Sequence, residues 1–287
     1  MLPISRTSAG THAYHAPLHG GGAGSRDSVV STASNPRRRI RRQSSGAGAT
    51  FSTYLRRMLS IPQMDFELAL WQMAYLVISP RRVYRNVYYN KQTKNHWARD
   101  DPAFHIIIAL CMCVAAIAYG IAKSVTFLGT LRLIAYTVFV EFLGAGLVIA
   151  TTAWFVTNQF MLQQQIHAVD QSVEWMYAFD VHCNAFVPFF LVTYVVQFFF
   201  LSIVLSDGFI CRLLANTIYL VAFVYYWYIT FLGYNGKRRA VVYNPAALPF
   251  LKNTIAFLYP IGLTLVLYFV SIFTFNASKA IFSLYYE

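Results

Sequence analysis

Five long runs of apolar residues follow one another through most of the chain. They cover approximately residues 103–122, 133–157, 183–205, 209–232 and 253–275. A helix rises about 1.5 Å per residue, so about 20 apolar residues cross the hydrocarbon core of a bilayer. Hydrocarbon offers the backbone no hydrogen-bond partner, which restricts spanning segments to helices or closed barrels. The sequence therefore predicts an all-α membrane protein with about five transmembrane helices, preceded by interfacial amphipathic helices.

The composition supports a membrane protein and excludes a nucleic-acid partner. Hydrophobic residues make up 57% of the 287 positions and charged residues only 12%, whereas soluble domains carry about 25% charged residues. The formal net charge is +12. Phosphate neutralisation needs a dense basic surface rather than a mostly apolar body. We therefore expect membrane lipids, and no nucleic acid, to be in contact with this chain.

The chain divides into three parts by composition. Residues 1–50 are rich in Ser, Gly and Arg with no long apolar run, which predicts a disordered basic cytoplasmic tail. Residues 51–101 are interpreted as cytoplasmic interfacial helices and a basic collar, and residues 102–287 as the five-span membrane domain. In the tail, a block of arginines precedes Ser44. This block is interpreted as a charge run attracted to anionic lipid, with a retrieval signal or a kinase site at Ser44 as alternatives.

Residues 64–78 read as a short helix before the first span. Ser79-Pro80 should end it, because proline disfavours helical geometry in the preceding residue. About 15 residues are too few to span comfortably, so the helix should lie in the interface or re-enter the bilayer, with a sixth span as the alternative. Asp101 and Pro102 mark the start of the first long span.

The distribution of basic residues predicts the orientation. The first 102 residues hold 15 of the 23 lysines and arginines, and residues 158–182 hold none. By the positive-inside rule, the amino terminus lies in the cytoplasm, and an odd number of spans places the carboxyl terminus in the lumen or outside. A glycosylation sequon at Asn276 then lies on the lumenal side. It adjoins the end of a span, so we expect it to be unused.

Glu141 is the one acidic residue well inside a predicted span. An ionisable side chain in hydrocarbon is costly and is by default a functional candidate. The structural alternative is a hydrogen bond to a polar neighbour, for which Asn216 and Gln197 are candidates. Beside Glu141, the small residues 144–146 permit close approach of another helix.

A second polar group, Asp180, His182 and Asn184, stands at the predicted entrance to the third span. It could bind a headgroup, a proton or a metal; the alternative is that Asp180 caps the helix and His182 lies at headgroup level. Asp and His two residues apart do not share a helix face, so we predict no metal site. No catalytic or nucleotide-binding motif is present in the sequence, so we predict no enzymatic activity and no cofactor. The four cysteines are interpreted as packing residues.

Several polar strings carry a resemblance to a known family. They include Gln63-Met64-Asp65-Phe66-Glu67, Trp97-Ala98-Arg99-Asp100-Asp101-Pro102, Tyr177-Ala178-Phe179-Asp180-Val181-His182 and Leu248-Pro249-Phe250-Leu251-Lys252-Asn253-Thr254. With these strings the chain resembles the uncoordinated-fifty family of Golgi multi-pass membrane proteins, as a fungal-type member with an extended amino-terminal tail. Residues 235–245 depart from that family and look like an insertion.

The resemblance implies a non-enzymatic Golgi protein in vesicular protein transport, which cycles with the endoplasmic reticulum in one reading. It also implies large Arf guanine-nucleotide exchange factors and membrane cargo as partners. Our own hypothesis from the residues is an adaptor whose basic collar binds a partner or lipid headgroups through Arg81, Arg82, Arg85, Lys91, Lys94 and Arg99. Acidic residues in 158–182 could pair with that collar or with a basic partner. The alternative is a lipid or ion handling protein that uses Glu141, Asp180 and His182.

Overall fold

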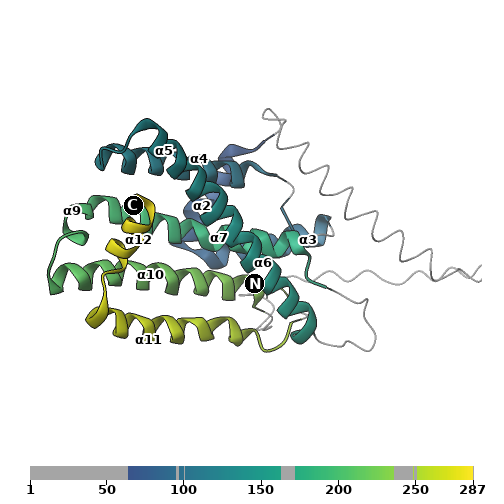
Figure 1. Cartoon of the computed structure of the whole chain (residues 1–287). Helices are drawn as coiled ribbons and strands as arrows, with labels where there is room; N and C mark the ends of the chain where they lie inside the picture. The colour runs from purple at the N-terminus through teal and green to yellow at the C-terminus, as the bar shows by residue number, and fades with distance from the viewer. Residues whose placement is uncertain are drawn as a thin grey trace, which may run out of the picture. The chain divides into compact units, whose positions relative to one another are not determined.

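The computed structural model describes residues 64–94, 97–99, 101–162, 172–235, 248 and 251–286 (Figure 1). The predicted tail at 1–50 and most of the predicted insertion at 235–245 lie outside these residues. So does the amphipathic stretch expected after residue 50. The side chain of Lys94 is likewise outside the described part.

Five helices in the described part are long and apolar enough to cross a membrane, as predicted. They are Ala103–Ala122, Phe127–Phe160, Trp175–Phe199, Phe209–Tyr234 and Thr254–Thr274. The first is α4 and the fourth is α10. The second joins α5 (Phe127–Ala135), η2 (Tyr136–Gly144) and α6 (Ala145–Phe160); the third joins α7 (Trp175–Phe190), η3 (Leu191–Val196) and α8 (Gln197–Phe199); the fifth joins η4 (Thr254–Leu258) and α11 (Tyr259–Thr274).

The second and third spans begin earlier than the apolar pattern predicts. The second starts at Phe127, because the Thr126 hydroxyl accepts a hydrogen bond from the amide of Gly129 at 3.2 Å and caps the helix. The third starts at Trp175, since polar residues of its first turns are buried against other helices. The first, fourth and fifth spans match the predicted ranges to within two residues.

Two more helices precede the first span. In α2 (Phe66–Ile78), the Asp65 side chain accepts from the Leu68 amide at 2.9 Å and caps the helix, which ends at Ser79 as predicted. With 13 residues, α2 is shorter than the five spans. The basic collar is itself largely helical, as α3 (Pro80–Lys94). Pro80 stands at its first position, where proline is tolerated, so the residue that ends α2 also begins α3.

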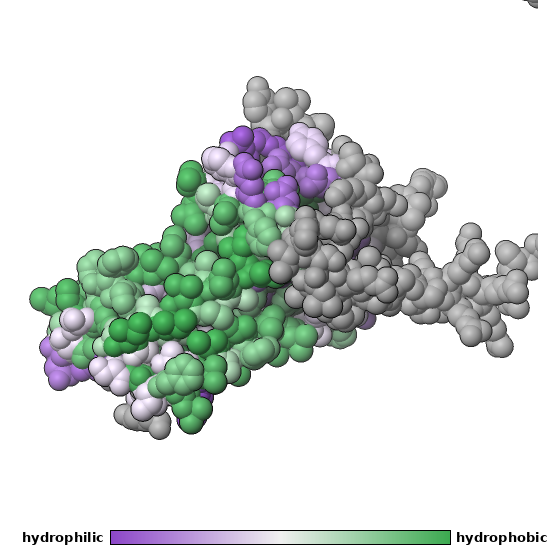
Figure 2. Space-filling model, turned by 90° about the horizontal axis from the view of Figure 1, so that it is seen from above, coloured by the Kyte–Doolittle hydropathy of each residue, from purple (hydrophilic) through white to green (hydrophobic). Residues whose placement is uncertain are grey.

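The helices form an elongated bundle in which α7 packs against α6 on one side and α10 on the other. α11 lies along α10 at the edge of the bundle (Figure 1). Figure 2 shows a broad hydrophobic surface with hydrophilic side chains gathered at its margins. Large apolar side chains on the spans are exposed, among them Leu110, Phe139, Leu147, Phe199, Leu263 and Phe273. Such a surface suits contact with lipid tails rather than water.

The end of the bundle opposite α3 carries a short helix that the sequence did not predict, α12 (Ala277–Tyr286). Asn216 of α10 holds it, because its Oδ1 accepts from the Ala277 amide at 2.8 Å. Its Nδ2 donates to Ser271 Oγ at 3.0 Å. Asn276 Nδ2 donates to the carbonyl of Val204, at the end of α9 (Leu201–Val204), at 2.8 Å. The amide nitrogen of the sequon is therefore engaged with the fold.

Candidate functional site

A cluster of buried polar groups joins α3, α4 and α7 at one end of the bundle. Asp180 is 4% exposed, and one of its oxygens accepts from the Arg99 amide at 2.6 Å. Its other oxygen lies 3.3 Å from His105 Nε2. Asn184 Oδ1 accepts from the Arg99 guanidinium at 2.5 Å, and its Nδ2 lies 3.5 Å from Tyr84 Oη. Burial raises the pKa of the Tyr84 phenol, so this side chain stays neutral.

The prediction that Asp180 caps the third span is therefore wrong, because the helix begins at Trp175, whereas the headgroup-level position of His182 stays a prediction. Both residues lie inside α7 and both are buried, at 4% and 3% exposure. A carboxylate is tolerated there because backbone and side-chain donors satisfy it. Hydropathy alone gave no sign of those donors, because they come from residues some 80 positions away.

Acidic residues of the segment before α7 do pair with the collar, but through its backbone. Glu174 accepts from the amides of Trp97 at 3.2 Å and Ala98 at 3.3 Å. Together with Asp180, it fixes the amides of residues 97–99. The collar is thus attached to the bundle through its backbone amides, and Arg81 of α3 adds a side-chain hydrogen bond, from its Nε to Tyr228 Oη of α10 at 3.3 Å.

The basic side chains predicted to bind a partner have different surroundings. Arg81, Arg82 and Arg85 of α3 are exposed, and we call these three the basic face of α3. The guanidinium carbon of Arg82 lies 4.5 Å from the centroid of the Tyr75 ring, over its face. Lys91 is half-buried with its Nζ 5.5 Å from the Trp97 ring, and Arg99 belongs to the buried cluster.

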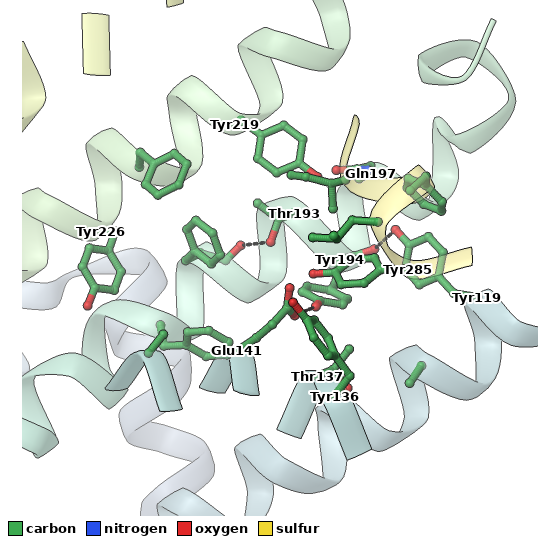
Figure 3. A pocket seen from close by; sticks show the side chains of 18 of the residues that line it. Tyr119, Tyr136, Thr137, Glu141, Thr193, Tyr194, Gln197, Tyr219, Tyr226 and Tyr285 are labelled. Atoms are coloured by element: carbon green, nitrogen blue, oxygen red, sulfur yellow. Dashed lines mark hydrogen bonds between the residues drawn. The ribbon is translucent and has the colours of Figure 1, made fainter. Parts of the chain in front are cut away.

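A second polar region lies inside the spans, around Glu141. A cavity of about 410 Å³ is lined by residues from η2, η3, α7, α10 and α12 among other elements. Its walls are mainly aromatic, while Glu141, Thr137, Thr193 and Gln197 supply polar groups (Figure 3). Figure 3 shows Glu141 and Tyr194 pointing toward one another across the cavity.

Two π-helical stretches meet at this cavity. The Tyr194 hydroxyl, from η3, donates to Glu141 Oε2, from η2. Tyr119 of α4 donates to the backbone carbonyl of Tyr194 at 2.9 Å. A π-helical turn inside an α-helix is rare and frequently marks a functional site. Nothing in the sequence pattern pointed to the π turns or to Tyr194.

Of the two polar neighbours predicted for Glu141, one lies near it and the other does not. Gln197 lines the same cavity, whereas Asn216 bonds to the ends of α11 and α12. The carboxyl is held by Tyr194 instead. The small residues beside it do permit close packing, because a Cβ added to Gly146 would lie 2.6 Å from the His182 ring.

The three residues of the lipid or ion alternative do not form one site. His182 lines the cavity together with Glu141, and its Nδ1 lies 2.8 Å from Tyr226 Oη. Asp180 belongs to the separate cluster with Arg99 and Asn184. Within the described ranges, no group of three His, Cys, Asp or Glu side chains could hold a metal ion, and Cys111, Cys113, Cys183 and Cys211 are free thiols.

A family model and individual known proteins point to the same family. A sequence model described as the UNC-50 family matches residues 54–286. The chain belongs to the UNC-50 family. It is 45% identical over 274 residues to "Protein unc-50 homolog" of Dictyostelium discoideum, covering 95% of this chain and 93% of that protein. The homolog of the same name in Homo sapiens is 46% identical over 227 residues, with 79% and 83% covered.

The family membership confirms the resemblance drawn from the polar strings. Those strings include residues 97–99 and Tyr177 to His182, which meet in the buried cluster. No solved structure is a significant match to the chain. The protein is thus a multi-pass membrane protein of the UNC-50 family.

Proposed function

We propose that the protein is a non-enzymatic adaptor in vesicular protein transport at the Golgi membrane. Its basic face of α3 recruits a large Arf guanine-nucleotide exchange factor and contacts anionic lipid headgroups. In this proposal the amino terminus and α3 lie in the cytoplasm and the carboxyl terminus in the lumen. Cycling with the endoplasmic reticulum and contact with membrane cargo belong to the same proposal.

One observation carries the proposal: α3 presents three exposed arginines from a helix that is held in place. Arg81, Arg82 and Arg85 are exposed, while Val83 and Tyr84 of the same helix are buried at 3% and 4% exposure. A partner therefore meets charges on a fixed scaffold, which lowers the ordering entropy lost on binding. Arginines also recognise carboxylates and phosphates through paired hydrogen bonds.

The distribution of charge supports the orientation. Most lysines and arginines precede the first span, as expected for a cytoplasmic segment. Clustered basic residues beside a span are also attracted to the anionic cytoplasmic leaflet, at about 1 kcal/mol per residue near the surface.

The test replaces Arg81, Arg82 and Arg85 by glutamine in the full chain and measures how much exchange factor remains on Golgi membranes. We expect recruitment to fall several-fold, because exposed charges are removed while the buried Val83 and Tyr84 are unchanged. Thermal unfolding of the variant checks that loss of the Arg81–Tyr228 hydrogen bond leaves the chain folded. Replacing the same three residues by lysine is the matched control, since it retains the charge, and it should keep most of the recruitment. Unchanged recruitment by the glutamine variant would overturn the proposal.

A further inference from the structure

The cavity between the two π-helical stretches is not used in the proposed adaptor function, and no residue of α3 is among the described residues that line it. Its volume is about 410 Å³. Small-molecule sites in proteins generally measure about 300–1,000 Å³. The cavity is therefore large enough for a small organic ligand, and its position within the spans makes membrane lipids the ligands that can reach it.

The polar groups of the cavity call for a hydrogen-bond donor. Gln197 is 1% exposed, and within the described residues its Oε1 has no hydrogen-bond partner. In the same cavity, Glu141 Oε2 accepts from the Tyr194 hydroxyl. A buried acceptor without a donor is unusual and requires an explanation. A ligand hydroxyl placed between Glu141 and Gln197 supplies the missing donor.

The remaining walls restrict the class of lipid. Among the described residues that line the cavity, none is Lys or Arg, so a phosphate headgroup would find no counter-charge. Aromatic rings cover most of the surface, including Tyr119, Phe186, Tyr219 and Phe282. Flat, rigid walls suit a flat, rigid ligand, which also loses less conformational entropy on binding than a flexible acyl chain.

The cavity reaches the surface of the bundle beside α12. Leu284 lines the cavity and is 69% exposed. Phe282 and Tyr285, from the same helix, also line it. A lipid in the membrane can therefore enter sideways past α12 without crossing the bundle.

We propose that this cavity binds one sterol molecule. Its single hydroxyl donates to Glu141 or Gln197, and its ring system lies between the aromatic walls. The wider π-helical turns of η2 and η3 make the room for it, since Glu141 and Tyr194 stand in those turns. The binding site is independent of the recruitment of an exchange factor.

The experiment labels the purified full chain with a photoreactive sterol probe and maps the labelled peptides. We expect labelling in the segments that line the cavity, which are residues 116–119, 133–149, 182–197, 219–227 and 281–285, and competition by unlabelled sterol. A sterol acetate, which lacks the free hydroxyl, should compete several-fold less well. Diacylglycerol, which also carries one hydroxyl, should compete several-fold less well because it lacks the rigid rings.

Two matched variants make the test specific. Ala145 lines the cavity and is exposed to it, so Ala145→Phe fills the space and should abolish labelling. Leu147→Phe adds a ring to the same helix, at a residue that is 55% exposed and does not line the cavity, and should label like the wild type. Gel filtration checks that both variants fold. Equal labelling of the two variants, labelling elsewhere or stronger competition by diacylglycerol would each overturn the proposal.

Discussion

The α3 end of the bundle and the cavity both hold polar side chains within an apolar protein, but their hydrogen bonding differs. At the α3 end, one oxygen of Asp180 accepts from the Arg99 amide and the other lies 3.3 Å from His105 Nε2, while Arg99 Nη1 is buried without a hydrogen bond among the described residues. In the cavity, Gln197 Oε1 has no partner among the described residues. The Asp180 carboxylate holds two segments of the chain together through the Arg99 amide, whereas the open amide oxygen of Gln197 can accept a hydrogen bond from a ligand. The polar cluster at the α3 end therefore holds the basic face of α3 in place, and the cavity is suited to binding a ligand.

Removing the carboxyl of the satisfied cluster should have the largest effect on stability. Asp180→Leu leaves the Arg99 amide without its acceptor and removes the carboxylate that lies 3.3 Å from His105 Nε2. Each buried group without a partner costs about 1–3 kcal/mol. Thermal unfolding of the detergent-solubilised chain should show a marked fall in midpoint temperature, with a smaller fall for Asp180→Asn. A midpoint equal to that of the wild type would contradict a stabilising role for the Asp180 cluster.

Crowding the contact between α6 and α7 should have the next largest effect. A Cβ at Gly146 would lie 2.6 Å from the His182 ring, so Gly146→Val should destabilise the chain by about 1–3 kcal/mol through overpacking. The same unfolding assay measures it. Gly262→Ala in α11 is the control, because a Cβ there meets nothing within 4 Å; it should be neutral or slightly stabilising. Equal destabilisation by both variants would contradict the packing.

Removing a hydrogen bond from the cavity should cost less than removing one from the α3 end. Tyr194→Phe deletes the hydroxyl that donates to Glu141. One hydrogen bond contributes about 0.5–1.5 kcal/mol net, and the cavity leaves room for another donor to replace it. The fall in midpoint should therefore be smaller than for Asp180→Leu. A larger fall would reverse the comparison between the two regions.

The smallest effect should come from the ion pair that ties α12 to the connector before α10. Lys279 bonds to the exposed Asp207, and this contact lowers the pKa of that carboxyl. The stabilisation is therefore present at neutral pH and is lost as the pH falls through the lowered pKa of the folded state. Midpoints of the wild type and Asp207→Asn should differ slightly at pH 7 and converge in acid. A difference that persists in acid would show that charge is not the cause.

The spans and the family were predictable from the sequence, since apolar runs and long polar strings are local features. The start of α3 at Pro80 was also a local signal. The collar was nevertheless interpreted only as a basic segment, because its composition is polar and charged. Thr126, a capping residue outside the apolar run, marked the true start of the second span.

The two polar regions could not be predicted in full, because their hydrogen bonds join distant residues. Asp180 and Arg99 are 81 positions apart, and Glu141 and Tyr194 are 53 apart. A polar residue near the start of an apolar run has the same appearance whether it lies at the headgroups or is buried by another helix. Periodicity also cannot reveal a π-helical turn, which depends on how neighbouring spans pack.

The account assigns partner recruitment to the basic face of α3 and ligand binding to the cavity. The most direct test of this assignment compares two variants in one recruitment assay. The membrane-bound fraction of the exchange factor is measured with the full chain carrying either glutamine at Arg81, Arg82 and Arg85, or Ala145→Phe in the cavity. We predict a several-fold loss of recruitment for the first variant and recruitment equal to the wild type for the second. Loss with Ala145→Phe and full recruitment by the glutamine variant would contradict the account.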